Sequence, residues 1–285
     1  MPIWSMRRRS YFRNRKLRVL VHREPHQVPI PQHRHEFHEI AIILSGSGTH
    51  VTGRFRHPLQ PGHVLVIGHG RAHGYEETRG LNLVNILIRD DLLPRIAREL
   101  GPMPGFHALF SMRKSSSYAS YLRLPPAELL QIAEWADRLE IETHQENQGG
   151  HLLAEAYLTL IMGVLCRKWG RTPAAHPKPE AALSKVLSWM EIHLGEELRV
   201  PKLARHAGMS ERSFHRAFRD ALHSSPLDYL LKIRLRAAAE KLRHTRLRIG
   251  EISQLCGFSD SNYFSRAFRK AMSQSPRAFR VANQE

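Results

Sequence analysis

A thirteen-residue segment occurs twice near the C-terminal end of this chain, and the repeat restricts the possible folds more than any other feature. Phe214–Pro226 reads FHRAFRDALHSSP and Phe264–Pro276 reads FSRAFRKAMSQSP, so eight of thirteen positions are identical at an offset of fifty residues. Upstream, LARHAGMS at Leu203–Ser210 matches ISQLCGFS at Ile252–Ser259. Self-similarity at a fixed offset indicates a duplicated structural unit. The C-terminal third is therefore predicted to contain one short helical unit in two copies.

Each copy has the pattern of two short helices joined by a glycine. In the first copy Val200–Ala207 precedes Gly208, and Ser210 is placed to cap a helix that begins at Glu211. The second copy has the same order: Ile249–Cys256, then Gly257, then Ser259 or Asp260 as the cap. A helix, a short glycine-containing turn and a second helix are the signature of a helix-turn-helix.

The second helix of each copy separates an apolar face from a polar face at about 100° per residue. The predicted inward residues are Phe214, Ala217, Phe218 and Ala221 in the first copy, and Phe264, Ala267, Phe268 and Ala271 in the second. The predicted outward residues are Arg212, His215, Arg216 and Arg219, and then Ser261, Asn262, Ser265, Arg266 and Arg269. Arginine bonds guanine and asparagine bonds adenine from the major groove. The alternative is the solvated face of an ordinary amphipathic helix, but the same division in both copies favours DNA reading.

The excess of positive charge is confined to two regions. The formal net charge is +17, of which residues 1–23 contribute +8 and residues 183–285 contribute +9, whereas residues 24–182 are neutral. A localised basic surface is typical of a protein with a polyanionic partner, because phosphate contacts dominate the affinity for nucleic acid. A basic face that only aids solubility is the alternative explanation of the charge taken alone.

The rest of the chain predicts a multi-domain α+β protein. Short β-rich runs between residues 17 and 89 suggest a compact antiparallel barrel or sandwich. The strand candidates are residues 17–22, 38–46, 48–55, 63–68 and 81–89. Helical periodicity follows over residues 125–147 and 151–169. The second of these helices offers a dimer seam, or else packs on its own barrel; the seam residues are Leu152, Leu153, Ala156, Leu160, Val164 and Leu165.

These patterns divide the chain into four segments. We expect a poorly ordered basic arm over 1–16, a barrel with helices over 17–169, a Pro/Ala-rich linker over 170–182 and a helical domain over 183–285. Within the last segment Pro226–Arg243 is a strong helix former, and its eighteen residues span roughly 27 Å. A strut of that length suits two reading heads about one DNA turn, ~34–36 Å, apart.

The C-terminal residues resemble the AraC/XylS family of transcription regulators. The resemblance lies in GFSDSNYFSRAFRKAMSQSPRAFR at Gly257–Arg280, with IGEISQLCGF and IRLRAAAEKL before it, and covers about Leu183–Arg280. It implies a seven-helix domain whose two recognition helices enter successive major-groove turns of double-stranded DNA. The DNA contacts carried over by position are Arg212, His215, Arg216, Arg219, Asp260, Ser261, Asn262 and Arg266.

The N-terminal domain contains a cluster of histidines. HRHEFHEIAIILSG places His33, His35 and Glu39 at the spacing of the first cupin motif, and PGHVLVIGHGRAH resembles the second motif and supplies His73. In a cupin barrel these four side chains converge, as a divalent-metal site with three nitrogens and one oxygen requires. Here His69 replaces the usual proline of the second motif. Three interpretations compete: effector contact or structure without metal, a structural or sensory transition metal, and a metalloenzyme.

We favour effector binding by these four residues, with no metal and no cofactor. HRHEFHEIAIILSGSGTHV and LNLVNILIR are similar to the rhamnose-operon activators of the AraC/XylS family. That resemblance implies a small effector, a carbohydrate, together with a homodimer and contact with RNA polymerase. The expected function is a ligand-controlled transcription activator and not an enzyme. The rival hypotheses are a cupin metalloenzyme with an accessory DNA domain and a nonspecific nucleic-acid binder.

Cysteine usage and hydropathy favour a cytoplasmic protein. Cys166 and Cys256 are the only cysteines, and both lie in apolar helical patterns, which fits a reducing compartment. No long uninterrupted apolar stretch is present, so we expect no membrane partner. The Arg-rich N-terminus lacks the apolar core of a signal peptide.

Overall fold

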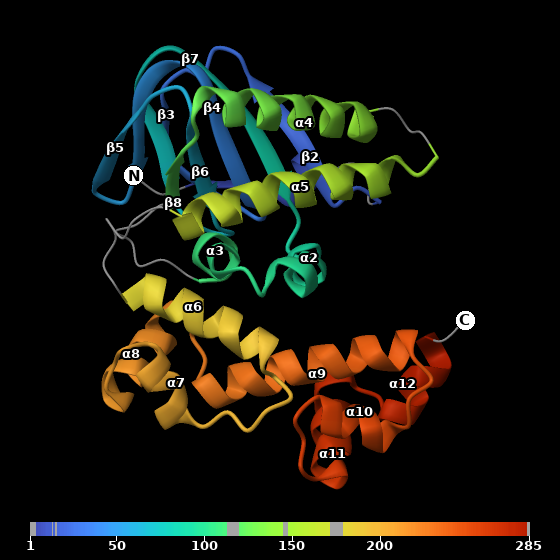
Figure 1. Ribbon diagram of the computed structural model, residues 1–285. Helices are drawn as coiled ribbons and strands as arrows, with labels where there is room; N and C mark the ends of the chain where they lie inside the picture. Colours follow the sequence, from blue (N-terminus) through green and yellow to red (C-terminus); the bar gives the residue numbers. More distant parts are fainter. Residues whose placement is uncertain are drawn as a thin grey trace. The chain divides into compact units, whose positions relative to one another are not determined.

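The computed structural model describes residues 4–12, 14, 16–112, 120–144, 148–171 and 179–283. The chain divides into two compact units, residues 1–176 and 177–285 (Figure 1). Most of the predicted linker, residues 172–178, lies outside the described residues.

The first unit is built on a mixed sheet that is antiparallel except at one edge. Its strands are β1 (Ser5–Met6), β2 (Val19–Glu24), β3 (Ile30–His35), β4 (His38–Thr52), β5 (Phe55–Leu59), β6 (His63–Ile67), β7 (His73–Ile88) and β8 (Ser120–Arg123). The strand order is β1-β3-β7-β4-β6-β8, with β2 paired to β7 and β5 paired to β4. Only the pairing of β1 with β3 is parallel among those between described strands.

Both faces of this sheet are buried, because side chains alternate along the strands. Ile40 and Ile42 of β4 pack in one cluster with the helices, whereas Ala41 and Ile43 pack in a second cluster with Tyr75. The helices are α1 (Arg8–Tyr11), α2 (Leu93–Leu100), α3 (Pro104–Phe106), the π-helical turn η1 (His107–Ser111), α4 (Pro126–His144) and α5 (Gly150–Arg171). Figure 1 shows α4 and α5 running side by side across one face of the sheet. The predicted barrel with two following helices is confirmed in this form.

Four strands were absent from the prediction, and two predicted strands are one. β1, β3 and β8 lie outside the predicted runs, and β5 begins at the last residue of one of them. β4 spans the predicted break between residues 46 and 48. Gly46 explains the continuity, since it adopts φ +77 and a Cβ there would meet the carbonyl oxygen of Gly80 at 2.1 Å. β4 therefore stays paired with β7 along its length, and the register of the pairing shifts between Ile43 and Thr49.

The N-terminal segment is more ordered than we expected. Met6 of β1 pairs with His35 of β3, Trp4 stacks on His33 at 5.1 Å between ring centroids, and Phe12 is buried against Phe37. Apolar and aromatic residues between the arginines account for this packing. The arm therefore lies against the same strand that supplies two of the predicted effector residues.

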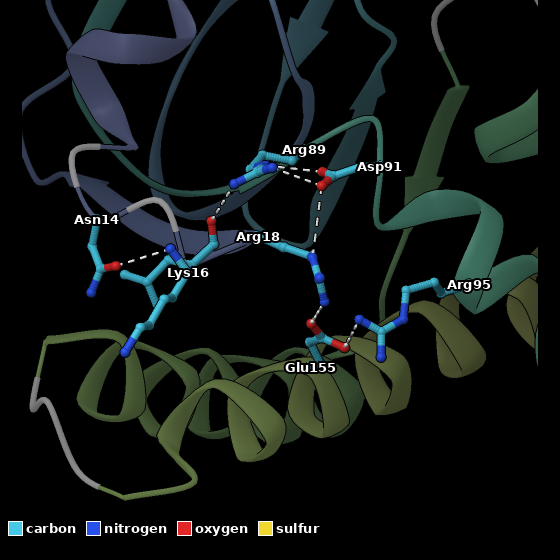
Figure 2. A network of polar contacts seen from close by, with 8 residues as sticks. Asn14, Lys16, Arg18, Arg89, Asp91, Arg95 and Glu155 are labelled. Atoms are coloured by element: carbon cyan, nitrogen blue, oxygen red, sulfur yellow. Dashed lines mark hydrogen bonds and ion pairs between the residues drawn. The ribbon is translucent and has the colours of Figure 1, made fainter. Parts of the chain in front are cut away.

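A polar network connects the start of β2 to α5 (Figure 2). Arg18 Nη1 donates to Glu155 Oε1 at 3.2 Å, and Arg95 Nη1 lies 3.7 Å from the other oxygen of Glu155. Asp91 is shared by Arg18 at 3.7 Å and Arg89 at 2.7 Å. These pairs fix one side of α5 in place against the barrel.

Helix α5 is long and apolar enough to cross a membrane by length and composition alone. Its residues Leu158, Ile161 and Leu165 are, however, fully buried in the core of the first unit. We therefore regard α5 as a core helix. The predicted dimer seam is wrong at Leu165, whereas Leu152, Leu153 and Leu160 are 58%, 50% and 49% exposed.

The second unit is entirely helical in its described part. Its helices are α6 (Pro179–Ile192), α7 (Val200–His206), α8 (Glu211–Leu222), α9 (Pro226–His244), α10 (Ile249–Leu255), α11 (Ser261–Met272) and α12 (Pro276–Asn283). The pairs α7–α8 and α10–α11 are the two predicted helix-turn-helix units, and α9 connects them. Seven helices are the number that the family resemblance implied.

The repeat in sequence is a repeat in backbone geometry. Gly208 and Gly257 adopt φ +64 and φ +79 in the two turns. His223 and Ser273, fifty residues apart, both end a recognition helix in the left-handed conformation. The duplicated segments therefore form the same structure twice.

Five of the eight predicted inward residues are buried, and Ala217 and Ala267 are half-buried. Phe214, Phe218, Phe264 and Phe268 are fully buried, and Ala221 is 8% exposed. The prediction is wrong at Ala271, which is exposed although its equivalent Ala221 is not. Ala271 lines an open groove between α9 and α11 together with Leu231 and Tyr263.

Candidate DNA interface and barrel site

The outer face of α8 presents three unpaired arginines. Arg212, Arg216 and Arg219 are exposed, and no acidic partner lies within ion-pair distance of them among the described residues. His215 is half-buried between them. The helix begins after Ser210, whose Oγ accepts from the Ser213 N–H at 3.3 Å. The four predicted contact residues of this copy thus share one face of α8, with Arg212 next to the helix N-terminus and Arg219 in the last turn.

The outer face of α11 carries fewer charges and more hydrogen-bonding groups. Ser261, Asn262 and Arg266 are exposed, and Asp260 caps the helix by accepting from the Asn262 N–H at 2.7 Å. Asp260 therefore caps α11 in the structure, in addition to its predicted contact with DNA. The Asn262 side-chain amide has no hydrogen-bond partner within the described residues. This face can supply the asparagine and arginine contacts that distinguish adenine and guanine.

The four predicted effector residues meet inside the first unit. His33 and His35 come from β3, Glu39 from β4 and His73 from β7, and none is more than 5% exposed. His33 pairs with His73 across the antiparallel strands, with ring centroids 4.5 Å apart. The potential ligand atoms of His35, Glu39 and His73 all lie within 4.8 Å of one another. The spacing in the sequence therefore corresponds to a real cluster.

Other buried polar residues of the cluster were missed by the sequence interpretation. His50 of β4 places Nε2 3.4 Å from Nδ1 of His73, and its own Nδ1 lies 2.8 Å from the Tyr121 hydroxyl. Tyr75 and Asn85 contribute a buried hydroxyl and a buried carbonyl oxygen that have no hydrogen-bond partner in the described structure. The only sign of this in the sequence is that His50 alternates onto the inward side of a predicted strand, residues 48–55.

Burial dominates the electrostatics of this cluster. Desolvation lowers the pKa of His35 to about 4 and that of His50 to about 3. Desolvation also holds the pKa of His73 well below its usual value, and the nearby His35 and His50 add to this effect. The same cause raises the pKa of Glu39 to about 8. Burial therefore favours the neutral form of each of these side chains.

A small cavity of about 70 Å³ opens onto the cluster. Its walls include Glu39 and His73 of the cluster, Asn85 of β7, and Met6 and Tyr11 of the N-terminal segment. The N-terminal segment therefore forms part of the cavity wall.

Comparison with known proteins identifies the family. The profile of the AraC-like ligand binding domain matches residues 18–161, and that of a helix-turn-helix domain matches residues 203–282. The chain is 32% identical over 278 residues to the HTH-type transcriptional activator RhaR of Mannheimia succiniciproducens, covering 98% of this chain and 97% of that protein. The chain belongs to the AraC family.

Other family members show the same relationship over most of their length. The HTH-type transcriptional activator RhaS of Enterobacter sp. is 32% identical, covering 89% of this chain and 88% of its own. RhaS of Escherichia fergusonii is 30% identical, covering 95% of both chains. The resemblance seen in the sequence is thereby confirmed. The chain is an AraC-family regulator with a ligand-binding domain and a DNA-binding helix-turn-helix domain. The similarity to transcriptional activators favours a regulator over an enzyme.

Proposed function

We propose that this chain is a sequence-specific transcription activator whose DNA binding is controlled by a small effector, a sugar, inside the N-terminal barrel. The observation that carries the proposal is the duplicated helix-turn-helix, in which both recognition helices bury the same two phenylalanines and present different outer faces. Equivalent positions such as His215 and Ser265 differ, whereas Arg216 and Arg266 are the same. Two heads of one scaffold with different surfaces suit two different half-sites. In this proposal, the residues that contact DNA are the ones predicted from the sequence for the two copies.

The effector is proposed to bind at His33, His35, Glu39 and His73. Support comes from the burial of all four residues beside a cavity with polar walls. A sugar needs more room than this cavity of about 70 Å³, and we propose that its entry displaces Tyr11 and Met6, which line the cavity. A ligand shifts a conformational equilibrium when it binds one conformation more tightly than the other. Here the two conformations are the one with the arm against the cavity and the one with the arm displaced. Activation is proposed because RhaR and RhaS, to which the chain is similar, are transcriptional activators.

The assembly is proposed to be a cytoplasmic homodimer that contacts RNA polymerase. The exposed leucines of α5, Leu152, Leu153 and Leu160, support dimerisation because they form an apolar surface beside the ion pairs of Glu155. The segment 170–182 serves in this proposal as the linker between the effector domain, 17–169, and the DNA-binding domain, 183–285.

The test is a gel-shift titration of the full chain on the DNA upstream of its own gene. We expect a sequence preference at moderate salt that changes when the correct sugar is present. His33→Ala should abolish the response to the sugar, whereas Arg34→Ala, an exposed neighbour on the same strand, should retain it. Equal affinity for all sequences would overturn the proposal of sequence-specific binding.

A further inference from the structure

The barrel cluster contains buried nitrogen atoms without a partner. His35 Nε2 and His73 Nε2 have less than 1 Å² of exposed surface and no hydrogen bond in the described structure. The Glu39 carboxylate lies beside them and has no lysine or arginine within ion-pair distance among the described residues. Buried polar atoms are rarely left without a hydrogen-bond partner, so two such nitrogens beside a buried carboxylate need an explanation.

The other nitrogen of each ring is already held in place. His35 Nδ1 lies 2.7 Å from the Phe37 carbonyl oxygen, to which only a protonated Nδ1 can donate. That tautomer leaves a lone pair on Nε2. His73 Nδ1 lies 3.4 Å from His50 Nε2, and His50 is in turn bonded to Tyr121. In metal sites, the ring nitrogen of a histidine that does not bind the metal usually donates to a carbonyl or a polar side chain, which orients the ring.

The distances fit a common ion. His35 Nε2 is 3.4 Å from Glu39 Oε2. Two ligands at about 2.1 Å from one ion and at the tetrahedral angle are about 3.4 Å apart. All three ligand atoms lie within 4.8 Å of one another, so closing the set on an ion needs side-chain shifts on the order of 1 Å.

We propose that His35, Glu39 and His73 bind one divalent first-row transition-metal ion, whose open positions face the barrel cavity. Two imidazoles and one carboxylate suit iron, cobalt, nickel or zinc, whereas calcium and magnesium prefer sets made of oxygen. Three protein ligands leave at least one position for water or a bound molecule.

This site also defines the chemistry of the effector, and in that respect the inference rests on the proposed function. The cavity beside the ion is lined by Tyr75 and Asn85, whose hydroxyl and Oδ1, respectively, have no partner in the described structure. The effector would place adjacent oxygen donors on the ion, as vicinal hydroxyls or a hydroxycarboxylate can do.

The experiment measures metal binding directly, without DNA and without effector. The full chain is stripped with a chelator and dialysed against Zn²⁺, Co²⁺ or Ca²⁺, and bound metal is determined by elemental analysis. We expect one equivalent of Zn²⁺ or Co²⁺ per chain after a second dialysis against metal-free buffer, and no retained Ca²⁺. Bound Co²⁺ should show the visible absorption of nitrogen and oxygen coordination.

Two kinds of variant test the assignment. Glu39→Gln and His73→Asn should lower the affinity for Zn²⁺ by more than about 100-fold, and Tyr121→Phe, which acts through His50 and His73, by about 10-fold. Asp90→Asn is the matched control, because Asp90 lies 3.1 Å from His38 and 2.5 Å from His69 in an exposed His–Asp–His cluster. This control should bind as the unmodified chain does.

The metal-free melting temperature of each variant shows whether it is folded. Retention of less than a tenth of an equivalent by the unmodified chain would overturn the inference, and so would full binding by the folded Glu39→Gln variant. Tight binding by a chain whose DNA affinity responds to no sugar would support the metal site and reject only the proposed effector control.

Discussion

The two units of this chain place their polar groups in opposite ways. The first unit buries His33, His35, Glu39, His50 and His73 in a barrel interior. In the described part of the second unit the buried polar residues are only serines, Ser184, Ser188 and Ser253, while its arginines are exposed or half-buried. Because burial of an unpaired polar group is costly, each arrangement points to where a ligand binds. One unit is built to enclose a small molecule and the other to bind a large one on its surface.

The largest expected effect concerns the apolar core of the second unit. Phe218→Ala and Phe268→Ala should each lower the free energy of unfolding by about 3–5 kcal/mol, because each ring is fully buried. Denaturant titration of the full chain measures this loss. Tyr263→Ala on α11 is the control, since that ring is 47% exposed and its loss should be far smaller. Equal losses for Phe268 and Tyr263 would contradict the assignment of the faces.

A second prediction concerns the pH dependence of stability, which the buried polar residues of the first unit should produce. The folded state raises the pKa of Glu39 to about 8, so between its ordinary value and pH 8 the folded chain holds a proton that the unfolded chain releases. Stability therefore falls as the pH rises through this window. The lowered pKa values of His35 and His50 act in the opposite direction, but only below about pH 6.5.

The clean window is therefore pH 6.5 to 8, in metal-free buffer. One proton corresponds to about 1.4 kcal/mol per pH unit, so the free energy of unfolding should fall by about 2 kcal/mol across it. Glu39→Gln should remove this fall. A variant whose stability falls as steeply as that of the unmodified chain would show that Glu39 is not the group responsible.

The same contrast explains which parts of the fold the sequence predicts. The helices of the second unit follow from local rules: Ser210 and Asp260 cap their helices, and Phe214 and Phe264 mark the buried face. β3 was missed because its inward residues are the histidines His33 and His35, which hide the apolar alternation that marks a strand. Polar residues kept for a site thus obscure the pattern that predicts the structure.

Long-range partners were also beyond the reach of local patterns. The burial of Leu165 against the barrel and the exposure of Ala271 depend on which elements pack beside α5 and α11. The cluster of His33, His35, Glu39 and His73 was predicted by its motif spacing, whereas His50 and Tyr121 join it only through strand pairing. The DNA contacts remain predictions, since exposure and free guanidinium groups support them without testing them.

A third prediction distinguishes base reading from phosphate binding on the outer surface. Arg266→Ala should weaken binding by about 1–3 kcal/mol at one base pair and little elsewhere, if this exposed side chain bonds a guanine. Affinities for a set of single-base variants of the DNA measure this. Arg277→Ala, an exposed arginine on α12 outside the predicted contacts, is the control. A uniform loss over all sequences would assign Arg266 to the phosphate backbone.

The smallest expected effect comes from a surface polar residue whose partner lies within its own helix. Ser210→Ala should cost about 1 kcal/mol of stability, because its Oγ accepts from the Ser213 N–H. Thermal unfolding measures the loss. Ser210→Asp retains an acceptor at the same position and should restore most of it. A loss that Asp does not restore would indicate that the serine acts in another way than as a cap.

The most direct test of the central claim is a base-by-base map of DNA affinity for the full chain at about 0.15 M salt. Two separate reading heads predict two blocks of sensitive base pairs about one helical turn, ~34–36 Å, apart. Asn262→Ala should remove the sensitivity at one base pair within one block, and Arg216→Ala at one base pair within the other. A single block, or an affinity that no base substitution changes, would contradict the account of two different reading surfaces on one duplicated scaffold.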